Sequence, residues 1–274
     1  MRFFLLISIY FIGDILNINV GDYVTRNSYN NDTVFKVLSI TEDTVYLKGV
    51  YVRLCADSKI SDLKKVMLTS DDFVVEETKE EMRDEFFYLP GKVLHIDGDS
   101  EYLEKCLKFY KDMGIHAIGK RISEENIANQ IIPLLEEFKP DIVIITGHDA
   151  FYKKRGDKDN VDNYKNSKNF AKAVRAARKY EKSQEKLVII AGACQSDYEE
   201  LIKAGANFAS SPKRVNIHAL DPAIIAINVA MTKRNEPIDI VKVLAKTKYG
   251  SDGIGGIITG GLMYVGFPRW ISTI

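Results

Sequence analysis

The sequence predicts an α/β fold with a mostly parallel sheet, preceded by a small β-barrel, and two patterns along the chain carry this prediction. Up to about residue 75, short alternating segments are separated by Gly, Asn and Asp, which is typical of antiparallel strands joined by turns. Beyond Gly91, unbroken apolar segments alternate with amphipathic ones, which is typical of parallel strands connected by helices. A length of 274 residues fits one or two domains, so we expect two folded regions.

The first region is predicted to consist of short strands with tight turns between them. Clear examples lie at 23–26, 34–38 and 44–48. Several such strands in so short a stretch favour an SH3-like barrel over residues 19–75, for which docking is the expected role. A dense run of charged residues follows it, and we interpret residues 76–90 as a charged linker.

The second region, residues 91–274, is predicted to alternate strands with helices. Strands are expected at 92–96, 117–118, 141–146 and 187–191, and helices at 100–113, 124–138, 167–182 and 197–204. The segment 141–146 is rich in β-branched residues, as expected for a strand that is buried on both faces. The glycine-rich segment 250–256 has no following helix of the phosphate-binding type, so we expect a flexible loop there and no nucleotide site.

Residues 1–18 form an apolar N-terminal extension in this scheme, with an uncharged run at 3–12. The run is shorter than the roughly 20 residues that span a bilayer, and no A-x-A-like cleavage site follows it. Three interpretations stay open: an upstream extension created by the choice of start codon, a packed or interfacial element, and an export signal. No later segment has the length and apolarity of a membrane span.

Charge and cysteine content narrow the classes of partner and site. Lys and Arg total 38, and Asp and Glu also total 38, so no charge excess favours nucleic acid or an anionic membrane. The three cysteines lack CxxC spacing, which argues against a disulfide framework or a structural zinc site. Proteins and small molecules remain as partners, a reducing cytoplasmic compartment fits best, and we expect neither metal nor organic cofactor.

Two of the predicted buried strands end in nearly the same way. The first ends in Ile144-Ile145-Thr146-Gly147-His148-Asp149, and the second in Ile189-Ile190-Ala191-Gly192-Ala193-Cys194. Functional groups in open parallel sheets gather beyond the carboxyl ends of the strands, so His148 and Cys194 should share one edge. The glycine before each of them allows a tight exit and should leave room for a substrate backbone.

Cysteine and histidine at one edge suit nucleophilic catalysis. A cysteine attacks as its thiolate, and a neighbouring imidazole can hold the proton and deliver it to the leaving amine. Backbone N–H groups around Cys194, at the start of the predicted helix 197–204, would stabilise an oxyanion. His148 precedes Cys194 by 46 residues, close to the spacing of about 50 in caspases, although a cysteine after an apolar strand can equally be inert packing.

Further residues are candidates for binding a substrate. Asp97 and Asp99 follow the first strand of the second region, where an acid would bind a basic substrate side chain, or would cap the next helix. Ser210 and Ser211 precede His218, which either lines the cleft or caps a helix. His95 is expected to be structural.

The sequence resembles the YabG family of sporulation-specific cysteine peptidases, which is similar in motif order to caspase-like peptidases. The segments that carry the resemblance are Gly91–Asp99, Ile145–Ala150, Gly192–Ser196, Ala204–Pro212 and Asn216–Pro222. The resemblance covers essentially residue 19 to the C-terminus. It implies a caspase-like three-layer sandwich and cleavage after Arg or Lys in spore coat or related sporulation proteins. The implied location is the cytoplasm of the mother cell of a spore-forming bacterium, or the spore coat.

The sequence departs from the wider caspase-like pattern at three positions. Asp149 follows the histidine where that pattern has Gly, so the backbone N–H of Asp149 would take the place of the glycine N–H in the oxyanion hole. Gly192 replaces the Gln of the caspase motif, and Ser196 replaces its Gly. Two other classes of function stay open: a non-enzymatic scaffold that binds coat proteins, and an amidase or acyltransferase of small molecules with the same dyad. The sequence does not predict an oligomeric state.

Overall fold

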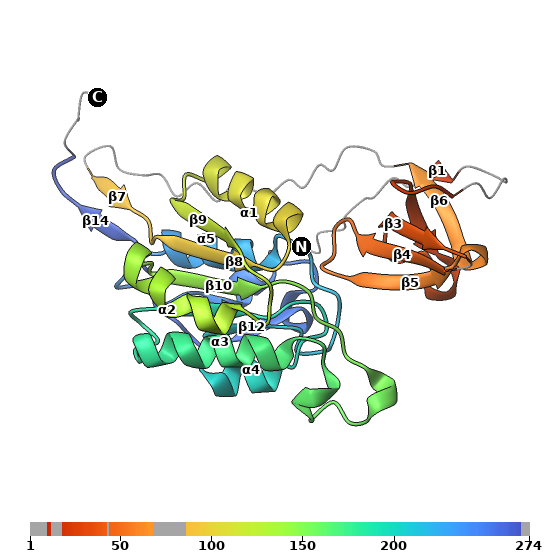
Figure 1. Cartoon of the computed structure of the whole chain (residues 1–274). Coiled ribbons are helices and arrows are strands. Elements are labelled where there is room, and N and C mark those ends of the chain that lie inside the picture. The colour runs from red at the N-terminus through yellow and green to blue at the C-terminus, as the bar shows by residue number, and fades with distance from the viewer. Residues whose placement is uncertain (1–9, 12–17, 43, 68–85, 270–274) are drawn as a thin grey trace. The chain divides into compact units, whose positions relative to one another are not determined.

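The structure, a computed structural model, describes residues 10–11, 18–42, 44–67 and 86–269. The chain divides into two compact units, residues 1–75 and 76–274, which are coloured red to orange and yellow to blue in Figure 1. Most of the predicted linker 76–90, and most of the predicted extension 1–18, lie outside the described residues.

Strands of the first unit form one antiparallel sheet, in the order β1-β6-β2-β3-β4-β5 (Figure 1). Their bounds are β1 Tyr10–Phe11, β2 Tyr23–Arg26, β3 Phe35–Thr41, β4 Thr44–Gly49, β5 Cys55–Lys59 and β6 Leu63–Met67, with 3-10 helices η1 Asn27–Tyr29 and η2 Ile60–Asp62. Val24, Phe35, Val37, Val45 and Leu47 are buried, as the alternation of apolar and polar residues predicts. β1 comes from the apolar run 3–12 and pairs with β6.

The second unit is built on a mostly parallel sheet, in the order β13-β12-β11-β10-β8-β9. The strands β8 to β12 run parallel, and β13 is antiparallel to β12. The sheet strands are β8 Val93–Asp97, β9 Ala117–Arg121, β10 Ile142–Thr146, β11 Val188–Ala191, β12 Phe208–Ser210 and β13 Ile254–Gly256. This arrangement confirms the predicted α/β fold with a mostly parallel sheet.

Helices cover both faces of this sheet, and a short two-stranded ribbon lies apart from it (Figure 1). The helices are α1 Ser100–Asp112, α2 Ile127–Phe138, α3 Ser167–Tyr180, α4 Tyr198–Ala204, α5 Asp221–Met231 and α6 Ile240–Leu244. The ribbon pairs β7 Phe87–Leu89 with β14 Tyr264–Gly266, and the 3-10 helices are η3 Lys153–Arg155, η4 Val161–Asn163 and η5 Gly250–Asp252. Helices α2, α3 and α4 pack on one face, whereas α1 and α5 contact each other and the other face.

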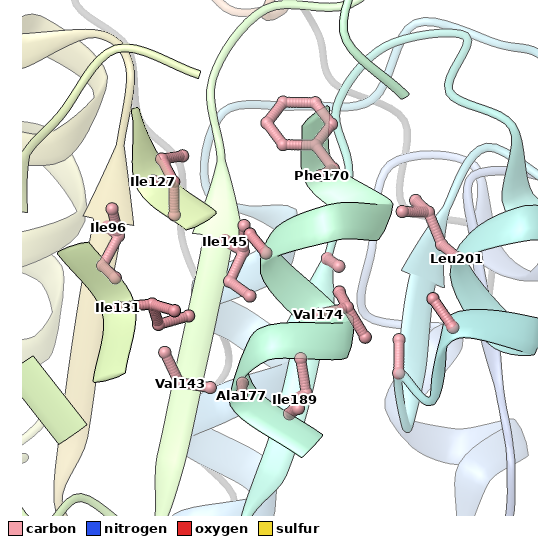
Figure 2. Packing of buried hydrophobic residues seen from close by; sticks show 14 of the residues in the cluster. Ile96, Ile127, Ile131, Val143, Ile145, Phe170, Val174, Ala177, Ile189 and Leu201 are labelled. Carbon is pink, nitrogen blue, oxygen red and sulfur yellow. The ribbon is translucent and has the colours of Figure 1, made fainter. Parts of the chain in front are cut away.

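The core under α2, α3 and α4 fixes the strands that lead to the candidate site. Strand residues such as Ile145 and Ile189 face Ile131 of α2 and Val174 of α3, and all four are buried (Figure 2). Burying an aliphatic side chain of this size contributes roughly 1.5–3 kcal/mol. Because strands β8, β10 and β11 are held in this way, the loops at their carboxyl ends start from fixed positions.

Two local predictions were wrong. Helix α2 begins at Ile127 and not at residue 124, so Glu124 lies in a turn after β9. The segment 250–256 is not a flexible loop, because its second half is strand β13 and Ile254 is fully buried. Glycine is required there by close packing, since a Cβ at Gly255 would lie 2.9 Å from Tyr198 Oη.

Arg178, near the end of α3, ties together the amino-terminal edge of the sheet. Its guanidinium donates to the carbonyls of Gly205 at 2.7 Å and Leu187 at 2.8 Å, and to Asn207 Oδ1 at 2.5 Å. Burial lowers the pKa of Arg178 to about 10, so the group remains charged at neutral pH. Removing it would take the side-chain donor from the carbonyls of Gly205 and Leu187.

We predict that Arg178→Ala lowers the free energy of unfolding by about 3 kcal/mol, because hydrogen bonds from a charged donor contribute about 1.5–3 kcal/mol each. Urea unfolding followed by circular dichroism measures the change. The control is Arg175→Ala on the same helix, whose exposed ion pair with Glu200 should contribute less than about 1 kcal/mol. Equal losses in the two variants would contradict this account of Arg178.

Candidate active site

The carboxyl edge of the parallel sheet gathers most of the residues that the sequence singles out. Strands β10 and β11 pair in register, with Ile145 opposite Ala191, so His148 and Cys194 each lie three residues after this pair. Strands β8 and β9 end at the same edge, with Thr146 opposite Asp97. This edge is therefore the candidate active site.

Cys194 is fully buried in the structure. Its Sγ donates a hydrogen bond to the carbonyl oxygen of Ile217, at 3.6 Å. The next residue, Gln195, fixes this segment to the loop after β12, because its backbone N–H donates to Ser211 Oγ at 3.0 Å. Access of a substrate to the thiol therefore requires the residues that cover it to move.

His148 lies between two carboxylates. Its Nε2 is 3.5 Å from Asp99 Oδ2, and its Nδ1 is 3.7 Å from Glu124 Oε1. The ring of Tyr102, on α1, lies 5.7 Å from the imidazole ring between centroids. The His148 side chain is 15% exposed, so the imidazole sits at the boundary between the interior and solvent.

Glu124 contacts both the backbone and the ring of His148. Its Oε1 accepts the backbone N–H of His148 at 2.8 Å. Burial alone would raise the pKa of Glu124, but the hydrogen bonds from His148 and its charge hold the pKa below the ordinary value. An ionised carboxylate at this position favours the protonated form of the imidazole.

The sequence predicts that the glycines before His148 and Cys194 leave room for a substrate backbone, and this prediction is wrong. A Cβ at Gly147 would collide with the carboxylate of Glu124, and a Cβ at Gly192 would lie 2.8 Å from Leu201 Cδ1. Gly192 also adopts a φ of +102°, which other residues rarely tolerate. The space beside each glycine is filled by side chains of this chain.

The carboxylate of Asp149 connects the loop after β10 to the loop after β11. Its Oδ1 accepts the backbone N–H of Ala150 at 2.9 Å and of Asn166 at 2.7 Å. Its Oδ2 accepts the hydroxyls of Ser167 at 2.5 Å and Ser196 at 2.8 Å. Asp149 is 2% exposed, and burial raises its pKa while the hydrogen bonds oppose the rise.

The two serines extend this network to both ends. Ser196 Oγ accepts the backbone N–H of Ala193, the residue before Cys194, at 2.9 Å. Ser167 Oγ, at the start of α3, accepts the backbone N–H of Asp197 at 2.7 Å. Because each hydroxyl accepts from a backbone N–H, it turns its own proton toward Asp149, and the segments around His148 and Cys194 are fixed to each other.

The two candidate acids after β8 occupy different environments. Asp97 is fully buried, with its Oδ2 3.5 Å from His95 Nε2, and its Oδ1 accepts the backbone N–H of Asp99. His95 in turn bonds the hydroxyl of Tyr110 at 2.9 Å, in line with its expected structural role. Asp99 caps α1 by accepting the backbone N–H of Glu101 through Oδ1, which leaves Oδ2 facing His148.

The remaining candidates line the side of the site next to Cys194. Ser210 is buried at the end of β12, and its hydroxyl has no hydrogen-bond partner among the described residues. Ser211 Oγ donates to the carbonyl of Val215 at 2.5 Å. His218 is buried, and its Nδ1 accepts the backbone N–H of Leu220 at 3.2 Å, so this nitrogen is unprotonated.

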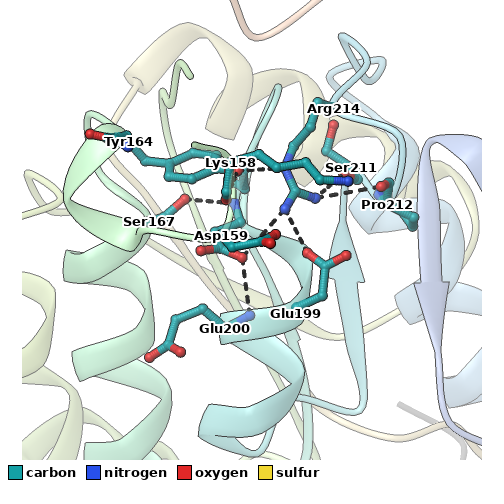
Figure 3. Close-up of polar contacts among 12 residues, drawn as sticks. Lys158, Asp159, Tyr164, Ser167, Glu199, Glu200, Ser211, Pro212 and Arg214 are labelled. Atoms are coloured by element: carbon teal, nitrogen blue, oxygen red, sulfur yellow. Dashed lines mark hydrogen bonds and ion pairs between the residues drawn. The ribbon is translucent and has the colours of Figure 1, made fainter. Parts of the chain in front are cut away.

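Arg214 braces the loop after β12 against the loop before α3 and the start of α4 (Figure 3). Its guanidinium donates to Glu199 Oε2 at 2.6 Å and to the hydroxyl of Tyr164 at 2.6 Å, and lies 3.5 Å from Asp197 Oδ1. Burial would raise the pKa of Glu199, but the hydrogen bond and charge of Arg214 keep it lowered. Arg214 also donates to the carbonyl of Ser211, whose hydroxyl accepts the backbone N–H of Gln195, so the cluster is linked to the segment that carries Cys194.

Sequence reasoning missed Glu124, Ser167, Ser196 and Arg214. Glu124 was assigned to the start of a helix, although it follows β9 by three residues and so lies at the same edge as His148. The rule about carboxyl ends of parallel strands places both Glu124 and Glu125 near this edge but does not choose between them. The serine and arginine contacts join segments that are distant in sequence, so no local pattern marks them.

Within the described ranges, no group of three or more His, Cys, Asp and Glu side chains is arranged to hold a metal ion. The helices of the same ranges all fall short of the length and apolarity needed to cross a membrane. Of the three cysteines, Cys55 is exposed, whereas Cys106 and Cys194 are buried and none forms a disulfide.

Comparison with known proteins identifies one family. The model of the family described as YabG peptidase U57 matches residues 19–78 and 69–268 of the chain. The sporulation-specific protease YabG of Bacillus subtilis (strain 168) is 39% identical to the chain over 286 aligned residues. That alignment covers 92% of this chain and 99% of the Bacillus protein, so the likeness extends over both units.

We predict that Asp149→Ala lowers the free energy of unfolding by about 4 kcal/mol, because it leaves four buried donors without an acceptor. Asp157→Ala, in the exposed part of the same loop, is the control and should change it by less than about 0.5 kcal/mol. Urea unfolding measures both. A loss in Asp149→Ala no larger than that in the control would show that the network does not hold the loops.

Proposed function

The chain belongs to the YabG peptidase family and is a peptidase, and we propose that it is a cysteine endopeptidase of sporulation. In this proposal it processes spore coat or other sporulation proteins and cleaves after Arg or Lys. The observation that carries the proposal is the register of β10 and β11, which brings the residues after both strands to one edge. The relative named a sporulation-specific protease, similar over its whole length, supports the biological setting.

The proposed mechanism is an acyl-enzyme route with a Cys194–His148 dyad. The thiolate of Cys194 attacks the scissile carbonyl carbon, and the tetrahedral oxyanion accepts hydrogen bonds from the backbone N–H groups of Cys194 and Asp149. His148 then gives its proton to the leaving amine as the C–N bond breaks. Water, deprotonated by His148, hydrolyses the thioester and regenerates the thiol.

Within residues 86–269 the N–H of Asp149 donates to no acceptor, which supports its part in the oxyanion hole. The route needs neither metal nor organic cofactor.

Of the two acids after β8, we assign the binding of a basic substrate side chain to Asp99 and not to Asp97. Asp97 is fully buried and faces His95, whereas the Asp99 side chain is 11% exposed and lies beside His148. A carboxylate at the rim can form a charge-assisted, bidentate contact with a guanidinium. Ser210, Ser211 and His218 would line the opposite side, next to Cys194.

Finer features of the fold belong to the same proposal. Residues 91–274 would be a caspase-like three-layer sandwich, and residues 19–75 an SH3-like barrel that docks protein substrates, with residues 76–90 as a charged linker. The protein would act in the mother cell of a sporulating bacterium, in its cytoplasm or at the spore coat. Membership of a peptidase family counts against a non-enzymatic scaffold.

We predict that wild-type protein releases new peptide termini after Arg or Lys, and that Cys194→Ala and His148→Ala lower the rate by at least roughly 1000-fold. Mass spectrometry of a coat-protein extract and of an Arg-containing peptide library provides the measurement. Cys55→Ser, which changes the exposed cysteine of the first unit, should retain full activity. Full activity of Cys194→Ala would refute the assigned nucleophile. If the wild-type protein hydrolyses small amides but no peptides, an amidase is favoured.

We also predict that Asp99→Asn lowers kcat/KM for substrates with Arg at the cleavage site roughly 100-fold more than for substrates with neutral citrulline, because only the Arg substrates lose a charge contact. Asparagine is a good helix cap, so α1 should remain intact. Glu101→Gln, exposed in the same turn of α1, is the control. Equal losses for Arg and citrulline substrates would show that Asp99 acts through His148 and does not bind the substrate charge.

A further inference from the structure

We propose that Glu124 is a positioning residue for His148, which fixes the orientation of the imidazole and favours its protonated form. The inference rests on the proposed dyad and adds a third residue to it. It is drawn from the contacts of Glu124 with two strand ends and with both the backbone and the ring of His148. Nothing in the sequence pattern distinguishes Glu124 from its neighbour Glu125.

The Glu124 carboxylate fills the space that two glycines leave open. Gly98 follows β8 and Gly147 follows β10, and a Cβ at either position would collide with this carboxylate. The Glu124 side chain is 13% exposed, so it is held within the protein and does not sample solvent as a surface glutamate does. Two neighbouring strands therefore provide the space for one acid beside His148.

A single oxygen atom of Glu124 contacts both the backbone and the ring of His148. Oε1 accepts the backbone N–H of His148 at 2.8 Å and lies 3.7 Å from Nδ1 of its ring. The ring distance is longer than a hydrogen bond, and such contacts often tighten when a substrate binds. A carboxylate on the Nδ1 side favours a proton on Nδ1, and Asp99 Oδ2 lies 3.5 Å from Nε2, so the two acids together favour the imidazolium that carries a proton on both nitrogens.

Several charged groups face the imidazole and together set its protonation. Asp99 approaches Nε2 from the start of α1, Glu124 approaches Nδ1 from the turn before α2, and Tyr102 of α1 packs against the ring. The carboxylate of Asp149 is engaged by Ser167 and Ser196. The lowered pKa of Glu124 agrees with a favourable interaction between its negative charge and the imidazolium.

Glu124→Gln tests the charge while keeping an oxygen that can accept the His148 N–H. In a thiolate–imidazolium pair, activity falls at high pH when the imidazolium loses its proton. Loss of the Glu124 charge should therefore move the alkaline limb of kcat/KM down by about one pH unit. The kcat should fall roughly 10- to 100-fold with KM nearly unchanged, because the proton transfer is affected and substrate binding is not. Glu125→Gln, exposed and adjacent, should match wild type in both respects.

A second measurement does not depend on activity. The ring protons of His148 are titrated by NMR in Cys194→Ala and in the double variant with Glu124→Gln, with the signal assigned from a His148→Asn variant. A His148 pKa lower by about one unit in the double variant supports the inference even if the peptidase proposal fails. An unchanged His148 pKa, or an alkaline limb and kcat equal to those of Glu125→Gln, would overturn it and leave Glu124 as a brace of the loop.

Discussion

The buried carboxylate of Asp149 is the contact on which the geometry of the candidate site depends. Parallel strands fix where the loops after β10 and β11 begin, but they do not fix how those loops lie relative to each other. Asp149 supplies that constraint through Ser196 on one side and Ser167 with Asn166 on the other. A fully satisfied buried network of this kind costs more to disturb than surface contacts do, so it holds reacting groups in one arrangement.

Negative charge around a single histidine is the second organising feature. Asp99 and Glu124 lie within 4 Å of opposite sides of the His148 ring. A cysteine nucleophile benefits from an adjacent imidazolium, because the positive charge stabilises the thiolate. The acids therefore act against deprotonation of the histidine, and the glycines after β8 and β10 are needed to make room for one of them.

The sequence was sufficient to predict the α/β fold, the order of its parallel strands along the chain and the edge where His148 and Cys194 lie, because buried β-branched segments and strand ends are local patterns. The strand β13 was mistaken for a loop, since its glycines serve close packing against Tyr198 and not flexibility. Glu124 and the Asp149 network were missed because their roles depend on contacts between segments that only the folded chain brings together. The burial of Cys194 agrees with one of the two alternatives that the sequence left open for this residue.

The central claim, that Cys194 is a nucleophile assisted by His148, is tested most directly by covalent trapping. The intact protein is incubated with a peptidyl-arginine chloromethyl ketone, and the adduct is located by mass spectrometry of a digest. The account predicts one adduct, on Cys194, formed at least roughly 100-fold more slowly in His148→Ala. An adduct confined to the exposed Cys55 would contradict it. So would labelling of Cys194 at the same rate in the wild-type protein and in His148→Ala.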